Sequence, residues 1–185
     1  MQFDYRTLDP NDSDTDPALL KGYLEAVNRG FHLTRVDEHG EKIWTEVVRG
    51  DKATLRGAWL KPEEFGASDI PVATIASWLG ELNTGAELID AHMVSDVSVA
   101  PAARRQGLAR RIITDTITDA AEQGRPLAAL TVTEGGIYRR FGFGPATFKT
   151  DIEVDVTRRF AFDEFTPFGR FVQIGSYYHQ LMPAL

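Results

Sequence analysis

The chain has 185 residues, of which 43% are hydrophobic and 25% are charged, values typical of one globular domain that buries a core without disulfides. The 20 Lys and Arg residues are outnumbered by 27 Asp and Glu residues, and the formal charge of −7 disfavours nucleic acid as a partner and suits a cationic one. The sequence contains no cysteine, which excludes disulfides, thiolate metal sites and a covalent cysteinyl intermediate.

Composition also argues against a metal centre and a membrane protein. The four histidines are scattered and lack the spacing of a metal-binding motif, so we expect no metal. No continuous stretch of the sequence is apolar over the length that is needed to span a bilayer. The N-terminus, beginning Met1-Gln-Phe-Asp-Tyr, has neither a basic nor an apolar signal region, so the cytoplasm is the expected location.

Helix and strand patterns divide the first 80 residues into five expected elements. Asp16 and Pro17 form a typical helix start, and Gly30 is a typical end. In the next helix, Ile43, Trp44 and Val47 are expected to face inward. The expected elements are a strand over 3–8, helices over 17–30 and 41–48, and strands over 53–60 and 70–79.

The second half of the chain predicts a strand, helix, strand unit. Such a unit is right-handed, its two strands are parallel, and ligands bind outside their carboxyl ends, here Val99 and Thr133. The expected elements are strands over 93–99 and 126–133 around a helix over 105–123, a short helix within 134–144, and further strands over 147–156 and 170–174.

The stretch from Val94 to Arg111 has the features of an anion-binding turn. Four arginines, at positions 104, 105, 110 and 111, lie where the expected helix has the positive end of its dipole. A bound anion would offset that repulsion, and Gly107 would let a phosphate approach the backbone. The alternative is an ordinary surface helix with solvated arginines.

Arg104-x-x-Gly107-x-Ala109 after a strand resembles motif A of the GNAT superfamily of acetyl-CoA-dependent N-acetyltransferases. The wider text resembles the Eis (enhanced intracellular survival) family, closely over residues 90–160 and loosely before them. This resemblance implies an α/β (α+β) GNAT fold, with a mixed central sheet and helices on both faces. The matching segments are Val97-Ser-Val-Ala-Pro101, Arg104-Arg-Gln-Gly-Leu108, Pro126-Leu-Ala-Ala-Leu130, Glu134-Gly-Gly-Ile-Tyr138, Arg140-Phe-Gly-Phe-Gly-Pro-Ala-Thr147 and Arg158-Arg159.

The resemblance implies a binding site for acetyl-CoA. Backbone groups of Val97 and Val99 match positions that pair with the pantetheine arm like an added strand. Thr133 and Glu134 match positions near the cofactor. The pyrophosphate is expected on the run that contains Arg104, Arg105, Gly107, Leu108 and Ala109.

Tyr138 matches the general acid of the family, which protonates the departing CoA thiolate. A phenol with a pKa near 10 can donate to a thiolate whose conjugate thiol has a pKa near 8.5. The plainer interpretation of Tyr138 is a core aromatic side chain on a short helix.

The acceptor side is represented by three residues. Phe31 and Trp44 fall near family positions that wall the acceptor pocket, although aromatic residues at helical spacing also occur as plain core. Asp96 stands where an apolar residue is expected in well-known members. Its carboxylate could hold a cationic amine or accept its proton, or it could be a solvated residue of the strand face.

Members of the Eis family are longer, about twice this length, with a second GNAT-like region and a C-terminal carboxylate that acts as base. We therefore expect a GNAT domain over 1–160 and an extension over 161–185, the start of a truncated second region. The chain is either a fragment or a minimal homologue that needs another base. Full-length relatives assemble as hexamers, which leaves a homo-oligomer open here.

These features predict an enzyme that transfers acetyl directly from acetyl-CoA to a primary amine. The expected acceptors are aminoglycosides, polyamines or lysine-like side chains, and a negatively charged protein favours such cations. A backbone N–H near Val99 would polarise the thioester carbonyl. The alternative is a non-catalytic acyl-CoA-binding or assembly module, or a fragment without its base; binding of nucleic acid or membrane is not expected.

Overall fold

The computed structural model describes residues 1–132, 135–146 and 153. The chain divides into two compact units, Met1–Ala146 and Thr147–Leu185, and every element below belongs to the first. The strands expected over 147–156 and 170–174 lie outside the described residues. So does the domain boundary expected at residue 160, which stays a prediction.

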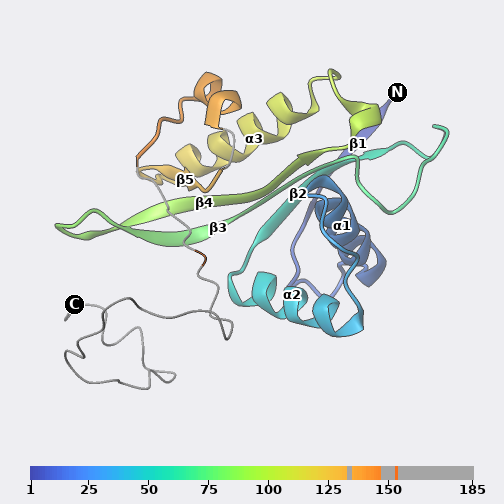
Figure 1. The fold of residues 1–185 in the computed structure, drawn as a ribbon, viewed down its shortest axis with the longest axis horizontal. Helices are drawn as coiled ribbons and strands as arrows, with labels where there is room; N and C mark the ends of the chain where they lie inside the picture. The colour runs from blue at the N-terminus through green and yellow to red at the C-terminus, as the bar shows by residue number, and fades with distance from the viewer. Residues whose placement is uncertain (133–134, 147–152, 154–185) are drawn as a thin grey trace, which may run out of the picture. The chain divides into compact units, whose positions relative to one another are not determined.

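The first unit contains one five-stranded sheet in the order β1-β2-β3-β4-β5 (Figure 1). Neighbouring strands are antiparallel except β4 and β5, which are parallel as the sequence predicts. β3 and β4 extend past the other strands as a long hairpin (Figure 1): β3 continues to Asn83 and β4 already begins at Leu88, where the sequence predicts strands over 70–79 and 93–99. The strands are β1 (Phe3–Leu8), β2 (Thr54–Leu60), β3 (Ala73–Asn83), β4 (Leu88–Val99) and β5 (Ala128–Leu130).

Helices cover both faces of the sheet, α1 and α2 one face and α3 the other (Figure 1). Asp16 caps α1 through a hydrogen bond that its carboxylate accepts from the Ala18 amide at 2.9 Å, and Pro17 is the first helical residue, as expected. Asp37 caps α2 in the same way. The helices are α1 (Pro17–Gly30), α2 (Glu38–Gly50) and α3 (Leu108–Glu122), with 3₁₀ turns at Pro101–Ala103, Gly135–Ile137 and Arg139–Phe141.

The core between the sheet and α1 and α2 corrects one sequence-based expectation. Trp44 packs against this core and Val48 is buried in it, but Ile43 and Val47 are about half exposed. Residues four apart share a helix face, so the Trp44 and Val48 pair faces the sheet and the other two lie about 100° round the helix. The core contains Leu8, Leu20, Tyr23, Val27, Val48, Ala53, Leu55, Trp59 and Ala76.

The core on the other face forms around α3. The helix begins at Leu108, three residues later than expected, because Gly107 has a φ of 80° and ends the preceding turn. β5 is also shorter than expected, with three paired residues in place of eight. The buried side chains of this core are Ala58, Ala73, Ile75, Val94, Ala103, Leu108, Ile112, Ile113 and Tyr138.

A polar cluster lies beneath the C-terminal half of α3. The Arg56 guanidinium, on β2, donates to Asp119 and, at 3.1 Å, to the Thr116 hydroxyl. His92 on β4 is buried, and its Nε2 has no hydrogen-bond partner within the described part of the chain. Burial, and then the Arg125 charge, lower the pKa of His92; Asp119 opposes this and Arg56 adds to it.

Stability is expected to fall as pH drops below about 6.5, the ordinary histidine value, because the unfolded chain takes up a proton at His92 that the folded protein accepts only at lower pH. One group contributes at most about 1.4 kcal/mol per pH unit. Urea unfolding between about pH 5 and pH 7 measures the slope. The His92→Asn variant should show a shallower slope, and equal slopes in both proteins would contradict this account.

Gly22→Ala is expected to lower the free energy of unfolding by about 1–3 kcal/mol, because a Cβ on Gly22 would overlap the Asp69 carbonyl and the backbone there cannot move away cheaply. Gly50→Ala is the matched control, since Gly50 ends α2 with nothing within 4 Å of its Cβ position. That control should be neutral or slightly stabilising. Denaturant unfolding of both variants checks the difference.

Candidate active site

β4 separates from β5 toward its carboxyl end. The two strands pair only from His92 to Val94, whereas β4 continues beside β3 as far as Val99. From Ser95 to Val99, therefore, the edge of β4 on the side of β5 has no strand partner among the residues that the structure describes. Such an edge presents free N–H and C=O groups to an extended ligand.

A β-bulge in β4 sets the direction of these backbone groups. Ser95 is opposite Ala76 and Ser98 is opposite Thr74, so Asp96 and Val97 together face one residue of β3. Asp96 has a φ of 55°, in the left-handed region that bulges use. One residue is thus inserted into the alternation of the strand.

The insertion moves the outward amides onto Val97 and Val99. Before the bulge, the His92 amide donates toward β5, to the Leu127 carbonyl at 2.9 Å. After it, the Ala100 amide donates toward β3, to the Val72 carbonyl at 2.8 Å. Alternation then directs the N–H and C=O groups of Val97 and Val99 to the open edge. These are the two residues that the family resemblance assigns to a pantetheine arm.

The turn after β4 presents amides to an anion. Arg105 and Gly107 have φ values of 64° and 80°, and nothing lies within 4 Å of a Cβ placed on Gly107. The first helical bond of α3 runs from the Arg111 amide to the Gly107 carbonyl at 3.0 Å, so the Leu108 and Ala109 amides precede the hydrogen-bonded helix. Free amides at a positive helix end are suited to phosphate.

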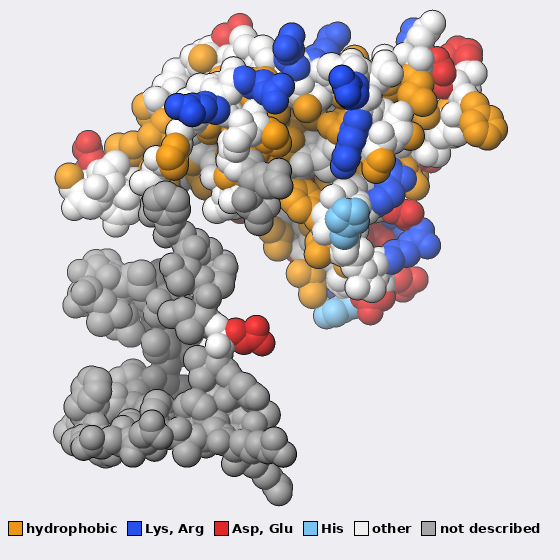
Figure 2. Space-filling view, turned by 45° about the horizontal axis from the view of Figure 1, so that its top comes forward, with side chains coloured by type: hydrophobic (Ala, Val, Ile, Leu, Met, Phe, Trp, Pro, Cys, Tyr) orange, Lys and Arg blue, Asp and Glu red, His pale blue; other side chains and the backbone are white. Residues whose placement is uncertain are grey.

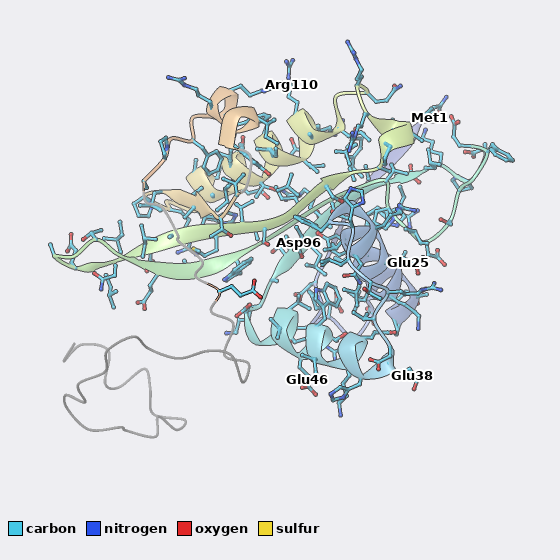
Figure 3. The ribbon with its side chains drawn as sticks, viewed as in Figure 1. Met1, Glu25, Glu38, Glu46, Asp96 and Arg110 are labelled. Carbon is cyan, nitrogen blue, oxygen red and sulfur yellow. The ribbon has the colours of Figure 1, made fainter. Side chains whose placement is uncertain are left out.

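The arginines divide into two groups. Arg111 stacks over the Tyr5 ring, 4.1 Å from its centroid, and its Nε is 3.6 Å from an Asp115 oxygen. Its charge therefore has partners within the protein, and its contribution to an anion site stays a prediction. Arg104, Arg105 and Arg110 are exposed and form no ion pair with another described residue. Figure 2 shows Lys and Arg side chains over this face, and Figure 3 places Arg110 on the side of α3.

The side chains of the predicted cofactor residues lie on the α3 side. Val97, Val99 and Ala109 pack against its core, and Leu108 is 1% exposed within it. These side chains are thus wholly or partly taken up by packing, and the backbone groups are the ones that face the open edge. Thr133 and Glu134 lie outside the described residues, so their expected place near the cofactor stays a prediction.

Tyr138 belongs to the same core. Its side chain is 8% exposed and meets the Phe143 ring edge-on, with 6.0 Å between the ring centroids. Burial raises the pKa of the Tyr138 phenol, which keeps it protonated at neutral pH. Val97 and Val99 pack against the same cluster. Tyr138 therefore lies on the α3 face of the sheet, as do the side chains of the two residues at the open edge.

Asp96 belongs to the opposite side of the sheet, which α1 and α2 cover (Figure 3). The Ser95 hydroxyl donates to Asp96 Oδ1 at 3.2 Å, and the Thr74 hydroxyl donates to the Asp96 carbonyl at 2.6 Å. Burial raises the pKa of the Asp96 carboxyl, which makes it a better proton acceptor. The bulge thus places a partly desolvated carboxylate next to the amides of the open edge.

The two aromatic residues predicted for the acceptor wall differ in their surroundings. Phe31, just after α1, is 50% exposed. Trp44 stacks on Tyr23, with ring centroids 6.2 Å apart and planes at 25°. Neither residue lines the small pocket at the carboxyl end of β4, which is lined by Ala26, Arg29, Gly30, His32, Pro71, Val72, Ser98, Val99, Ala100, Pro101 and Arg104.

A family model described as an acetyltransferase (GNAT) domain matches residues 19–146, which include the open edge of β4 and the turn after it. The chain belongs to the GNAT acetyltransferase family. A structure of a predicted acetyltransferase from Clostridium acetobutylicum with acetyl-CoA has the same fold, with a TM-score of 0.59, 16% identity and coverage of 82% of this chain and 96% of that one.

Two curated relatives define the position of the chain within the GNAT family. An uncharacterized N-acetyltransferase of Streptomyces griseus is 34% identical over 159 residues, 85% of this chain and 35% of the relative. The N-acetyltransferase Eis of Mycobacterium tuberculosis is 50% identical over 68 residues, 37% of this chain and 16% of that protein. The likeness to Eis is thus confined to part of the GNAT domain.

The matched part of the chain spans about a third of the length of the Streptomyces relative, so this relative is longer than the chain, as expected of the family. Within the described residues, no cluster of three or more His, Cys, Asp or Glu side chains could hold a metal. No helix in the described ranges has the length and apolar character needed to cross a membrane.

Sequence reasoning missed two features of the GNAT site. The bulge was missed although it has a signal in β4: Ser95 and Asp96 are consecutive polar residues between Val94 and Val97, which interrupts the alternation of apolar and polar residues. The second is Tyr23, which the helix pattern over 17–30 does not distinguish from a plain core position. Its hydroxyl group, which a core position does not require, was the available signal.

Proposed function

We propose that this GNAT domain binds acetyl-CoA along the open edge of β4 and transfers the acetyl group to a primary amine. Two observations together support the proposal: β4 separates from β5 after Val94, and β4 has a bulge at Asp96. The separation leaves a place for an extended arm between the strands. The bulge brings two outward amides and one carboxylate to the inner end of that place.

The residues of the site fit acetyl-CoA. The pantetheine arm contains amide groups, which the backbones of Val97 and Val99 can bind as a neighbouring strand would. The pyrophosphate is anionic, and the amides from Arg104 to Ala109, with exposed arginines around them, suit it. When bound, acetyl-CoA supplies the activated acetyl group as a thioester.

The proton balance gives Asp96 and Tyr138 separate roles. An ammonium acceptor must lose two protons to become an amide. In the proposal, Asp96 takes the first proton and frees the lone pair that attacks the thioester carbon. The C–S bond then breaks, Tyr138 gives its proton to the CoA thiolate, and the second nitrogen proton restores Tyr138. An outward amide of Val97 or Val99 would stabilise the negative charge on the carbonyl oxygen.

For the acceptor we propose a cationic primary amine of the kind suggested by the Eis resemblance: an aminoglycoside, a polyamine or a lysine side chain. The net charge of −7 and the partly buried carboxylate of Asp96 favour such a molecule. Trp44 and Phe31, on the side of the sheet where Asp96 lies, would contact its carbon skeleton. The 50% identity with Eis over 68 residues supports placement near that branch.

Gly107→Ala is expected to weaken CoA binding about tenfold or more, because a Cβ would occupy the approach of the phosphate and alanine disfavours the left-handed conformation. Gly124→Ala is the matched control. Gly124 has a φ of 72° with nothing near its Cβ position, so it shares the backbone strain but lies at the other end of α3. Calorimetry with CoA compares the two, and equal losses of affinity would contradict the site.

Tyr138→Phe is expected to lower kcat by about 10²–10⁴, the range for loss of a general acid, and to leave the affinity for CoA unchanged. Thiol release with acetyl-CoA and a panel of primary amines measures the turnover. Tyr5→Phe removes a hydroxyl from another tyrosine that packs against the same core, and it should retain activity. Undiminished kcat in Tyr138→Phe would remove Tyr138 from its proposed role.

The same assays separate the alternative function. CoA binding by calorimetry, together with no turnover on any amine of the panel, would favour a non-catalytic acyl-CoA-binding module over the enzyme.

A further inference from the structure

The Tyr23 hydroxyl is a buried polar group with no assigned task. Its side chain is 0% exposed in the core between α1 and the sheet. Its oxygen has no hydrogen-bond partner within the described part of the chain. A buried hydroxyl of this kind normally has a partner, and phenylalanine would fill the same space without the cost of desolvation. A hydroxyl at this position therefore costs stability, which suggests that it has a function.

The surroundings of Tyr23 connect it with the proposed acceptor site. On one side its ring stacks on Trp44. On the other side it packs in a cluster with Ala76, the residue of β3 that pairs with Ser95 at the start of the bulge. Burial raises the pKa of Tyr23, the negative charge of Asp96 raises it further, and the Ile75 backbone N–H near the phenol oxygen lowers it. The Asp96 carboxylate therefore lies within electrostatic reach of the phenol, whose own O–H remains available as a donor.

The path of α1 agrees with this arrangement. At the end of the helix, a Cβ placed on Gly30 would lie 2.5 Å from the Ser98 Cβ, so α1 crosses directly over the end of β4. Tyr23 is seven residues earlier, two turns back on the same helix face. It therefore faces the sheet on the side that α1 covers, which is the side where Figure 3 shows Asp96.

The Asp96 carboxylate has room for another hydrogen bond. Its contact with the Ser95 hydroxyl is 3.2 Å long, beyond the usual range of a hydroxyl donor. The Thr74 hydroxyl, which is also close, donates to the Asp96 carbonyl instead and is 2.7 Å from the Ser98 hydroxyl. Tyr23 is thus an unused donor beside a carboxylate that is weakly held.

We propose that Tyr23 is a positioning residue for Asp96: its hydroxyl binds the carboxylate when the Asp96 side chain turns from Ser95, and this fixes the carboxylate beside the acceptor amine. The inference rests on the proposed function, in which Asp96 takes a proton from the amine. The phenol donates to Asp96 while it is charged. After Asp96 takes the proton from nitrogen, the new acid O–H donates to the phenol oxygen, so the hydrogen bond persists with its direction reversed.

The test is the titration of Asp96 in the full chain without substrates, followed by carbon NMR of labelled aspartate carboxyl groups. Asp96→Asn identifies the signal by its loss. In Tyr23→Phe the proton affinity of Asp96 should rise about three- to tenfold, because a donor that favours the charged form is removed. Tyr5→Phe, which removes a hydroxyl on the other face of the sheet, should leave the titration unchanged.

Kinetics give the second readout. With acetyl-CoA and an amine from the panel, Tyr23→Phe should lower kcat and move the pH profile in the same direction as the Asp96 titration, with KM for acetyl-CoA unchanged. An unchanged titration in a Tyr23→Phe protein that unfolds like the parent would overturn the inference. So would a titration that responds to Ser95→Ala and not to Tyr23→Phe.

The two readouts separate this inference from the proposed function. A shifted titration without turnover by any variant would contradict amine acetylation and still support the hydrogen bond between Tyr23 and Asp96. Turnover that is lost in Asp96→Asn and unchanged in Tyr23→Phe would support the enzyme and overturn the positioning role.

Discussion

The candidate site depends on one extra residue in β4. Because two residues of β4 face a single residue of β3, the alternation of the strand changes at Asp96. Without that insertion, the amides at the open edge would belong to Asp96 and Ser98, and the Val97 and Val99 side chains would lose their places in the α3-side core. A single backbone irregularity thus determines both the hydrogen-bonding edge and the packing beneath it.

The sheet separates two kinds of chemistry onto its two faces. On the α3 side are the Tyr138 phenol, the glycine turn and the exposed arginines, which suit an anionic ligand with a sulfur leaving group. On the α1 side are Asp96 and the aromatic residues Tyr23 and Trp44, which suit a cation. The bulge connects the two faces, because the backbone that follows it faces the open edge while the Asp96 carboxylate faces α1.

Much of the fold follows from the sequence, because helix caps and apolar periodicity are local signals. Asp16 and Pro17 begin α1 as expected, and the parallel pairing of β4 with β5 follows from the strand, helix, strand order. Local signals fail where the backbone leaves regular geometry. The helix start near Arg105 was placed three residues early, and the register change at Asp96 depends on pairing with a distant strand. The family resemblance identifies Tyr138 as a candidate, whereas the burial of Tyr23 and its electrostatic coupling to Asp96 are visible only in the structure.

The positive φ of Asp96 restricts what this position can become. Aspartate and asparagine adopt the left-handed region more readily than most side chains, and glycine does so freely. A β-branched or bulky residue there would strain the bulge and, through it, the amides that face the open edge. The backbone geometry and the proposed acceptor chemistry therefore depend on the same residue, and asparagine and glycine are the replacements that would remove its charge with the least strain on the bulge.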